Sequence, residues 1–262
     1  MISKIVANRA NWAWPYAIVL LVFVVMPLVM IVYYSFQDAE GQWSLHNFHK
    51  FFLSTDSVNT LIYSIGIAMI TTIFCILLGY PAAYFMAKTE YLLPKVMASL
   101  FILPMWINVL LRTLATVALF DFAHLPLGEG ALVFGMVYNF LPFMVLPLYN
   151  TLSRIEKDVF EAARDLGANG FQTFTRVTLP LSIPGIISGI TMVFIPALTT
   201  FVISDLLGGS KILLIGNVIE QEFKQLNNWN VGSAMSVILM LFIVISMVVT
   251  SKYDKDGEGV LM

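Results

Sequence analysis

Long apolar stretches separated by short polar segments dominate this sequence. Five of the stretches contain no Lys, Arg, Asp or Glu, and a sixth contains only Arg112. A helix needs about 20 largely apolar residues to cross the hydrocarbon core of a bilayer, and every stretch is long enough. The predicted transmembrane helices cover residues 10–37, 57–87, 96–120, 130–153, 177–204 and 225–251.

The pattern also indicates the fold class. A helix satisfies its own backbone hydrogen bonds inside lipid, and the weak alternation typical of outer-membrane barrel strands is absent. We therefore predict an all-α, polytopic membrane protein with six transmembrane helices. The composition agrees: 59% of the 262 residues are hydrophobic and 11% are charged, against about 25% charged in soluble domains.

Basic residues predict the orientation of these helices. Ten Lys and Arg residues lie on the side of the termini and only three lie on the other side. The cytoplasmic segments of membrane proteins usually carry an excess of Lys and Arg, so both termini are expected in the cytoplasm. The expected location is the plasma or inner membrane. The first apolar stretch is too long for a cleaved signal and is read as a retained span.

Charge and cysteine content exclude other classes of protein. The net charge of −2 argues against a nucleic-acid-binding surface. Cys75 is the only cysteine, so no intrachain disulfide can form. His46 and His49 lie three residues apart, but no cysteine or carboxylate cluster completes a metal site, and His124 is read as a loop residue.

Motifs for catalysis are missing from the chain. It has no GxxxxGK[ST] phosphate loop, no HExxH and no GxSxG. We therefore expect no enzymatic activity and no cofactor, so uphill transport would draw its energy from an ion gradient or another subunit. A coupled carrier is disfavoured because such carriers usually hold ionisable residues at membrane depth.

The segment between the fourth and fifth spans is amphipathic. Its apolar residues recur every three or four positions, at Leu152, Ile155, Val159, Ala162, Ala163 and Leu166. This spacing predicts a helix that Gly167 ends, followed by a second short helix from the N-cap Asn169 to Pro180. The pair could lie on the bilayer surface, but the small Ala162 and Ala163 favour a groove in a partner protein.

The same segment resembles a known motif. Glu161-Ala162-Ala163 is followed by Gly167 and, after nine residues, by Val177, Leu179 and Pro180. This spacing is similar to the EAA loop of the permease subunits of type I ABC importers, with Val177 in place of isoleucine. The resemblance implies that Glu161, Ala162, Ala163, Gly167, Leu179 and Pro180 couple the chain to an ATPase, through a cytoplasmic coupling loop over residues 151–184.

Other stretches narrow the resemblance to the first permease subunit of spermidine/putrescine importers. They are residues 78–84, 103–108, 141–149, 161–168, 204–209 and 213–219. The resemblance implies a MetI-like fold, a single permease domain over residues 1–262, two ATP-binding subunits, a second homologous permease and an extracytoplasmic substrate-binding protein. The alternatives are a permease of the same family for another solute or cation, and a carrier or channel that works without ATP.

Trp106, Asn108 and Asp205 are candidates for the substrate pathway, and Arg112 and Asp205 are candidates for a gating pair. Trp106 and Asn108 lie eleven and thirteen residues beyond Lys95, roughly 16–20 Å along a helix and near the bilayer centre. A polyamine would favour aromatic faces and a few oxygen atoms there. Arg112 lies one turn further out, and Asp205 is placed at the outer end of the fifth span. Asp205 could contact the substrate or form a gating ion pair with Arg112.

Close helix packing is predicted in the fifth span. Gly185 and Gly189 lie four residues apart, an arrangement of small residues that lets helix backbones approach. We expect this face to pack within the chain.

Overall fold

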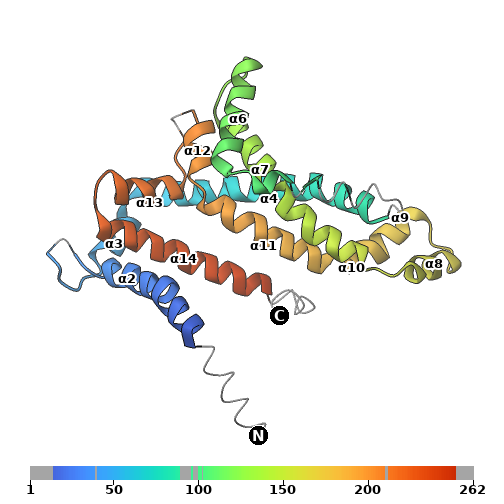
Figure 1. The fold of residues 1–262 in the computed structure, drawn as a ribbon, viewed down its shortest axis with the longest axis horizontal. Coiled ribbons are helices and arrows are strands. Elements are labelled where there is room, and N and C mark those ends of the chain that lie inside the picture. Colours follow the sequence, from blue (N-terminus) through green and yellow to red (C-terminus); the bar gives the residue numbers. More distant parts are fainter. Residues whose placement is uncertain are drawn as a thin grey trace, which may run out of the picture. The chain divides into compact units, whose positions relative to one another are not determined.

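Helices form nearly all of the regular structure (Figure 1). The computed structural model describes residues 14–38, 40–88, 96, 100–101, 103–209 and 212–251. The elements are η1 (Leu21–Val25), α2 (Met26–Ser35), α3 (His46–Leu53), α4 (Thr55–Lys88), η2 (Leu103–Trp106), α6 (Val109–Phe122), α7 (Glu129–Ser153), α8 (Lys157–Asp165), α9 (Gly170–Thr173), η3 (Phe174–Thr178), α10 (Leu179–Leu181), α11 (Ile183–Thr199), α12 (Val202–Leu207), α13 (Ile215–Lys224) and α14 (Trp229–Ser251).

Most predicted spans correspond to helices. Among the described residues, four helices are long and apolar enough to cross a membrane, including α4, α7 and α14. The fourth runs from Trp14 to Ser35 and contains η1 and α2. Residues 170–181 and α11 meet at a bend of 59°, and this pair makes a fifth candidate if it is counted as one broken span. Within the predicted fifth span, 177–204, the chain bends at Ser182, and α11 covers Ile183–Thr199.

The third apolar stretch is not one continuous helix. It contains the 3-10 turn η2, and α6 begins only at Val109. Asn108 interrupts the helical path with an extended backbone and caps α6 through its side chain. The 14 residues of α6 extend about 21 Å, less than the roughly 30 Å of a hydrocarbon core.

The chain divides into two compact units. One contains residues 1–58 and 219–242, and the other contains residues 59–218 and 243–262. In the first unit, the buried Asn47 amide donates to the carbonyl oxygens of Ser35 and Gln37, at 3.2 and 2.6 Å. Asn230 donates to the carbonyl oxygen of Asp38 at 2.7 Å. The grouping of both units into a single permease domain stays a prediction.

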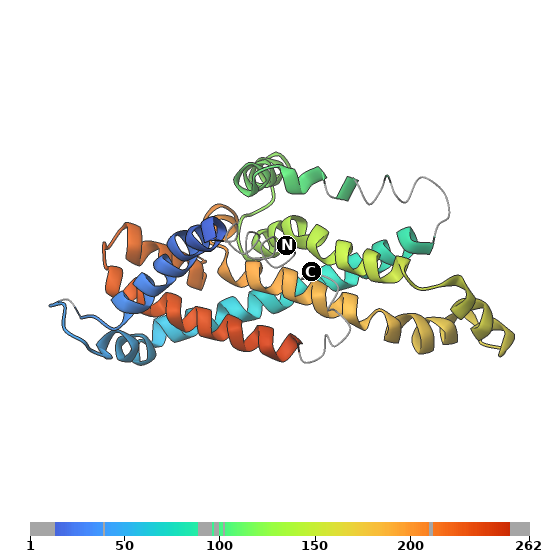
Figure 2. The same cartoon turned by 60° about the horizontal axis from the view of Figure 1, so that its bottom comes forward.

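The core of the second unit is the packing of α11 against α7 (Figure 2). A Cβ atom on Gly189 would lie 2.5 Å from the sulfur of Met144, and one on Gly79 would lie 3.0 Å from Met144 Cγ. Met144 on α7 is thus held between glycines of α4 and α11. The prediction that the glycine face of the fifth span packs within the chain is confirmed.

Gly185 also packs closely in this interface, against a short side chain and the backbone of α7. A Cβ atom there would lie 2.6 Å from Thr151 Oγ1 and 3.0 Å from the carbonyl oxygen of Pro147. We expect Gly185→Val to destabilise the protein by about 1–3 kcal/mol, because the α7 backbone must shift. Thermal unfolding in detergent measures this. The control is Gly66→Val, where nothing lies within 4 Å, and equal melting temperatures for both variants would contradict the prediction.

Candidate coupling site and transport path

The first helix of the coupling loop is shorter than the sequence predicts. α7 continues to Ser153 and α8 begins at Lys157, so Leu152 and Ile155 do not belong to the same helix as Val159. The cause is Glu156, whose extended backbone makes it the N-cap of α8. The apolar periodicity continues through this break because Leu152 is buried in α7.

The turn between the two short helices is as predicted. Gly167 has a φ of +80°, in the left-handed region that glycine adopts without strain. The amide of Ala168 donates to the carbonyl oxygen of Ala163 at 3.0 Å, closing the end of α8. Asn169 then caps α9 in a capping box with Gln172, with bonds of 2.9 and 3.0 Å. Both the glycine stop and the Asn169 N-cap are confirmed.

The second helix does not end at Pro180. Residues 170–181 continue through α9, η3 and α10, and the bend follows at Ser182. The turn before Pro180 is π-helical, with the amide of Leu179 donating to the carbonyl oxygen of Phe174. This wider turn relieves the clash that a proline ring makes with the preceding turn of an α-helix. Leu179 and Pro180 are both exposed.

The tip of the coupling loop presents apolar side chains to its surroundings. Leu166 is 89% exposed and Phe171 is 76% exposed, one on each side of the Gly167 turn. Ala163 is buried, whereas Glu161 and Ala162 are exposed. An exposed apolar tip next to charged residues is typical of a surface that binds another protein.

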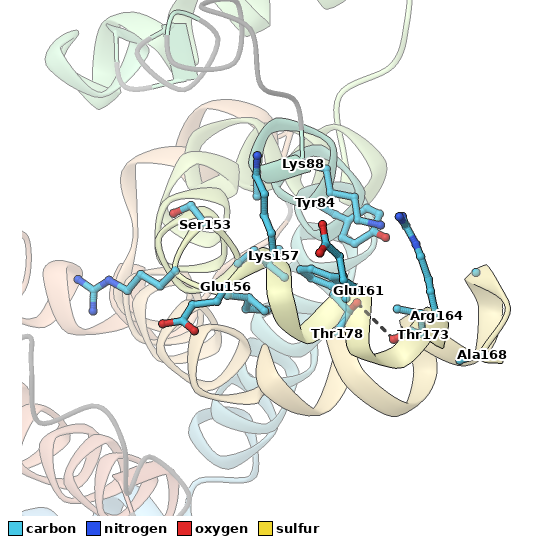
Figure 3. Close-up of a pocket in the computed structure, with 16 residues that line it drawn as sticks. Tyr84, Lys88, Ser153, Glu156, Lys157, Glu161, Arg164, Ala168, Thr173 and Thr178 are labelled. Carbon is cyan, nitrogen blue, oxygen red and sulfur yellow. Dashed lines mark hydrogen bonds between the residues drawn. The ribbon is translucent and has the colours of Figure 1, made fainter. Parts of the chain in front are cut away.

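A cavity of about 610 Å³ lies behind this tip, between the end of α4 and the coupling loop. The Lys88 ammonium lies over the ring of Tyr84 at 4.5 Å and over the ring of Phe160 at 5.5 Å. Figure 3 shows Glu161 pointing to the same side of the pocket as Tyr84 and Lys88. Sequence reasoning missed this part of α4, although Tyr80, Tyr84 and Lys88 recur every four residues, the spacing of one helix face.

Trp106 and Asn108 lie outside regular α-helix. Trp106 ends η2 and its side chain is 84% exposed. Asn108 Oδ1 accepts a hydrogen bond from the amide of Leu110 at 2.8 Å. The polar requirement of Asn108 is thus met by capping α6, and its contact with substrate stays a prediction.

Arg112 is buried inside the second unit. Its side chain is 7% exposed, and its guanidinium donates to the carbonyl oxygen of Asn139 on α7 at 3.4 Å. Within the described part of the chain, Arg112 Nε and Asn139 Oδ1 have no hydrogen-bond partner. A hydrogen bond therefore joins Arg112 to the backbone of α7.

Asp205 lies on α12, a separate short helix beyond the end of α11. Its carboxylate accepts a hydrogen bond from the Asn217 amide. Among the described residues, Arg112 and Asp205 do not form an ion pair with each other. The gating pair stays a prediction.

The predicted site residues do not include Asn217, which is the buried centre of a hydrogen-bond network. Its Oδ1 accepts from Ser204 Oγ at 2.6 Å and from the amide of Leu214 at 2.9 Å. Its Nδ2 donates to the carbonyl oxygen of Phe201 at 3.1 Å as well as to Asp205. One side chain therefore ties α12 to the start of α13.

Comparison with known proteins places this geometry in a family. Residues 76–255 match the model of the family described as "Binding-protein-dependent transport system inner membrane component". The chain belongs to this family. It is a multi-pass membrane protein, and its relatives are permease subunits of transport systems.

Individual relatives cover most of the chain. The spermidine/putrescine transport system permease protein PotB of Escherichia coli is 38% identical over 245 residues, covering 85% of this chain and 89% of the relative. PotB of Haemophilus influenzae is 36% identical over 262 residues and covers 90% of both. A PotB homolog of Mycoplasma genitalium is 28% identical over 78% of this chain and 76% of its own length. The resemblance seen in the sequence is confirmed.

Solved structures establish the fold. A chain of a bacterial alginate ABC transporter, in complex with a periplasmic protein bound to alginate pentasaccharide, has a TM-score of 0.77 at 14% identity and covers 99% of this chain and 98% of its own. A chain of the MetNI methionine ABC transporter has a TM-score of 0.61 at 16% identity, covering 76% and 94%. The predicted all-α, MetI-like permease fold is confirmed.

Proposed function

We propose that this chain is a permease subunit of an ATP-driven importer of spermidine and putrescine. The observation that carries the proposal is the coupling loop: two short helices turned at Gly167, with Leu166 and Phe171 exposed at the tip. The polyamine cargo is supported by the relatives named PotB, of which this chain covers most of the length.

The partners follow from this assignment. The chain pairs with a second homologous permease to form the pathway, rests on two ATP-binding subunits and receives substrate from an extracytoplasmic binding protein. It hydrolyses no ATP itself. Closure of the two ATP-binding subunits would move the coupling loop and swing the attached helices, which gives alternating access.

Co-purification tests the proposal. An affinity-tagged chain, co-expressed with a second permease and an ATPase of such an importer from the same organism, is expected to retain both proteins in detergent. In proteoliposomes the complex should hydrolyse ATP faster when binding protein and spermidine are added together. Stimulation by another solute alone would favour a same-family permease with different cargo. Uptake by the chain without any ATPase would favour a carrier or channel.

Cysteine labelling tests the predicted orientation. Gly170→Cys lies in the coupling loop and Ala123→Cys lies just beyond α6, and both positions are exposed. We expect a membrane-impermeant maleimide to label Gly170→Cys only from the cytoplasmic side and Ala123→Cys only from outside, because basic residues concentrate on the side of the coupling loop. Cys75 is buried and gives the background. Labelling of both positions from one side would contradict the six-span topology.

Trp106 tests the path of the cargo. Trp106→Leu is expected to lower spermidine uptake about 2- to 30-fold, which corresponds to the loss of a cation–π contact of about 0.5–2 kcal/mol. Assembly of the complex should stay intact. The matched control is Phe122→Leu, since Phe122 is also an 84% exposed aromatic side chain. Equal uptake by both variants and the wild type would remove Trp106 from the path.

A further inference from the structure

The end of α4 that faces the coupling loop presents one continuous face of side chains. Tyr80, Tyr84 and Lys88 follow one another at intervals of four residues, so they lie on the same side of the helix. All three contact residues of the coupling loop or of the bend that follows it. We call this set, with Phe160, Phe174 and Ser182, the α4 clamp.

The coupling loop has two arms, α8 and the segment 170–181. Both contact the face of α4 that carries Tyr80, Tyr84 and Lys88. On the η3 arm, the Phe174 ring lies edge-on to the rings of Tyr80 and Tyr84, with centroids 5.8 and 5.7 Å apart and interplanar angles of 90° and 88°. On the α8 arm, the ring of Phe160 lies 5.5 Å from the ammonium of Lys88. Edge-to-face rings and cation–π contacts are directional, so they hold both arms in a fixed orientation to α4.

A buried hydrogen bond joins the same face to the bend. Tyr80 Oη and Ser182 Oγ lie 2.9 Å apart, and Ser182 Oγ donates to the carbonyl oxygen of Leu179 at 2.9 Å. The single proton of Ser182 is thereby used, so Tyr80 is the donor to Ser182. Ser182 is completely buried and lies where residues 170–181 meet α11 at 59°. The clamp therefore contacts the bend at Ser182 as well as the two arms of the coupling loop.

The geometry suits the transmission of a force. The segment 170–181 has 12 residues and is about 18 Å long at 1.5 Å per residue. Its far end carries the exposed Phe171, and its near end is the bend at Ser182. A displacement of the tip would turn this segment about Ser182, and the contacts of Phe174 and Tyr80 would pass that motion to α4.

We infer that the α4 clamp makes α4 move together with the coupling loop, so that ATP-driven displacement of the loop reaches α4 as well as the directly connected α11. Its members are positioning residues and bind no substrate. This inference rests on the proposed function, because the loop must be moved by an ATPase. Loss of the clamp uncouples ATP hydrolysis from transport and leaves the docked ATPase in place.

Four variants test the clamp in the reconstituted complex. Tyr80→Phe and Ser182→Ala each remove the buried hydrogen bond with little change of volume, Phe174→Leu removes the edge-to-face contacts, and Lys88→Met removes the ammonium but keeps the stem. The measured quantity is the amount of spermidine transported for each ATP hydrolysed. We expect it to fall about fivefold for Tyr80→Phe, the factor that one net hydrogen bond contributes, with normal co-purification of the ATPase. Tyr138→Phe, at an exposed tyrosine of α7, is the control.

The double variant Tyr80→Phe/Ser182→Ala sharpens the test. If the two hydroxyl groups act as one unit, the double variant should lose no more coupling than Tyr80→Phe alone. A purely structural role would lower the yield or melting temperature of the complex and leave the transport per ATP at the wild-type value in all four variants; that result would overturn the inference. If the wild-type chain retains no ATPase, the proposed function itself is wrong. That result distinguishes its failure from a failure of the clamp inference.

Discussion

Replacing Gly167 with valine is expected to abolish spermidine-stimulated ATP hydrolysis while leaving the membrane-spanning helices folded. Gly167 has a φ of +80°, and a Cβ atom there would meet nothing within 4 Å. The penalty is therefore backbone strain alone, at least about 1–2 kcal/mol for a side chain in the left-handed region. Relief of that strain would reorient α8 relative to α9 and separate Leu166 from Phe171, the two apolar residues at the tip.

Co-purification of the ATPase and its stimulated hydrolysis rate measure this effect. The matched control is Gly170→Val, three residues away, where a Cβ atom also meets nothing within 4 Å and φ is not positive. The control should retain the ATPase at close to the wild-type level. Normal ATPase binding and stimulation in Gly167→Val would show that the turn does not set the docking surface.

Replacing Asn217 with leucine is expected to be the most destabilising single change at the α12–α13 junction. The substitution leaves the carboxylate of Asp205, the amide of Leu214 and the carbonyl oxygen of Phe201 without their bonds to this side chain. Leu214 is completely buried, and an unsatisfied buried group costs about 1–3 kcal/mol, so we expect a loss of that size. Yield and melting temperature in detergent should both fall sharply.

Asn150→Leu provides the comparison for this experiment. Asn150 is exposed near the end of α7, so its side chain can be replaced with little loss. An Asn217→Leu protein as stable as Asn150→Leu would mean that the network contributes little to folding. Spermidine uptake can be measured on the fraction of Asn217→Leu protein that folds. It shows whether the position of Asp205 matters for transport.

Local physics explains what could be predicted along the coupling loop. The glycine at 167 and the N-cap at 169 act through backbone conformation and bonds to residues three or four positions away, so the sequence displays them directly. The start of α8 was misplaced because the apolar period runs across the break: Leu152 is apolar to suit the core of α7, whereas Val159 lies on the coupling helix. Periodicity records which residues are apolar but not which helix they belong to.

The interrupted third span shows the same distinction. Hydropathy over 96–120 indicates an apolar environment, and Arg112 is indeed buried. Continuity of the helix is a different property, and Asn108 breaks it by using its side chain as a cap. Nothing in hydropathy reports whether an asparagine caps a helix or faces a wet cavity, because both place a polar group in an apolar stretch.

The sequence by itself determined the membrane environment, the helical class, the two-helix coupling loop and the glycine face of α11, because lipid and backbone stereochemistry act on each segment separately. Only the tertiary structure decided the bend at Ser182, the attachment of Asp205 to Asn217 and the contacts of Tyr80 with Ser182 and Phe174. These features join residues 12 to 102 positions apart. Their energies depend on which side chains the fold brings within a few ångströms, and no local pattern encodes that proximity.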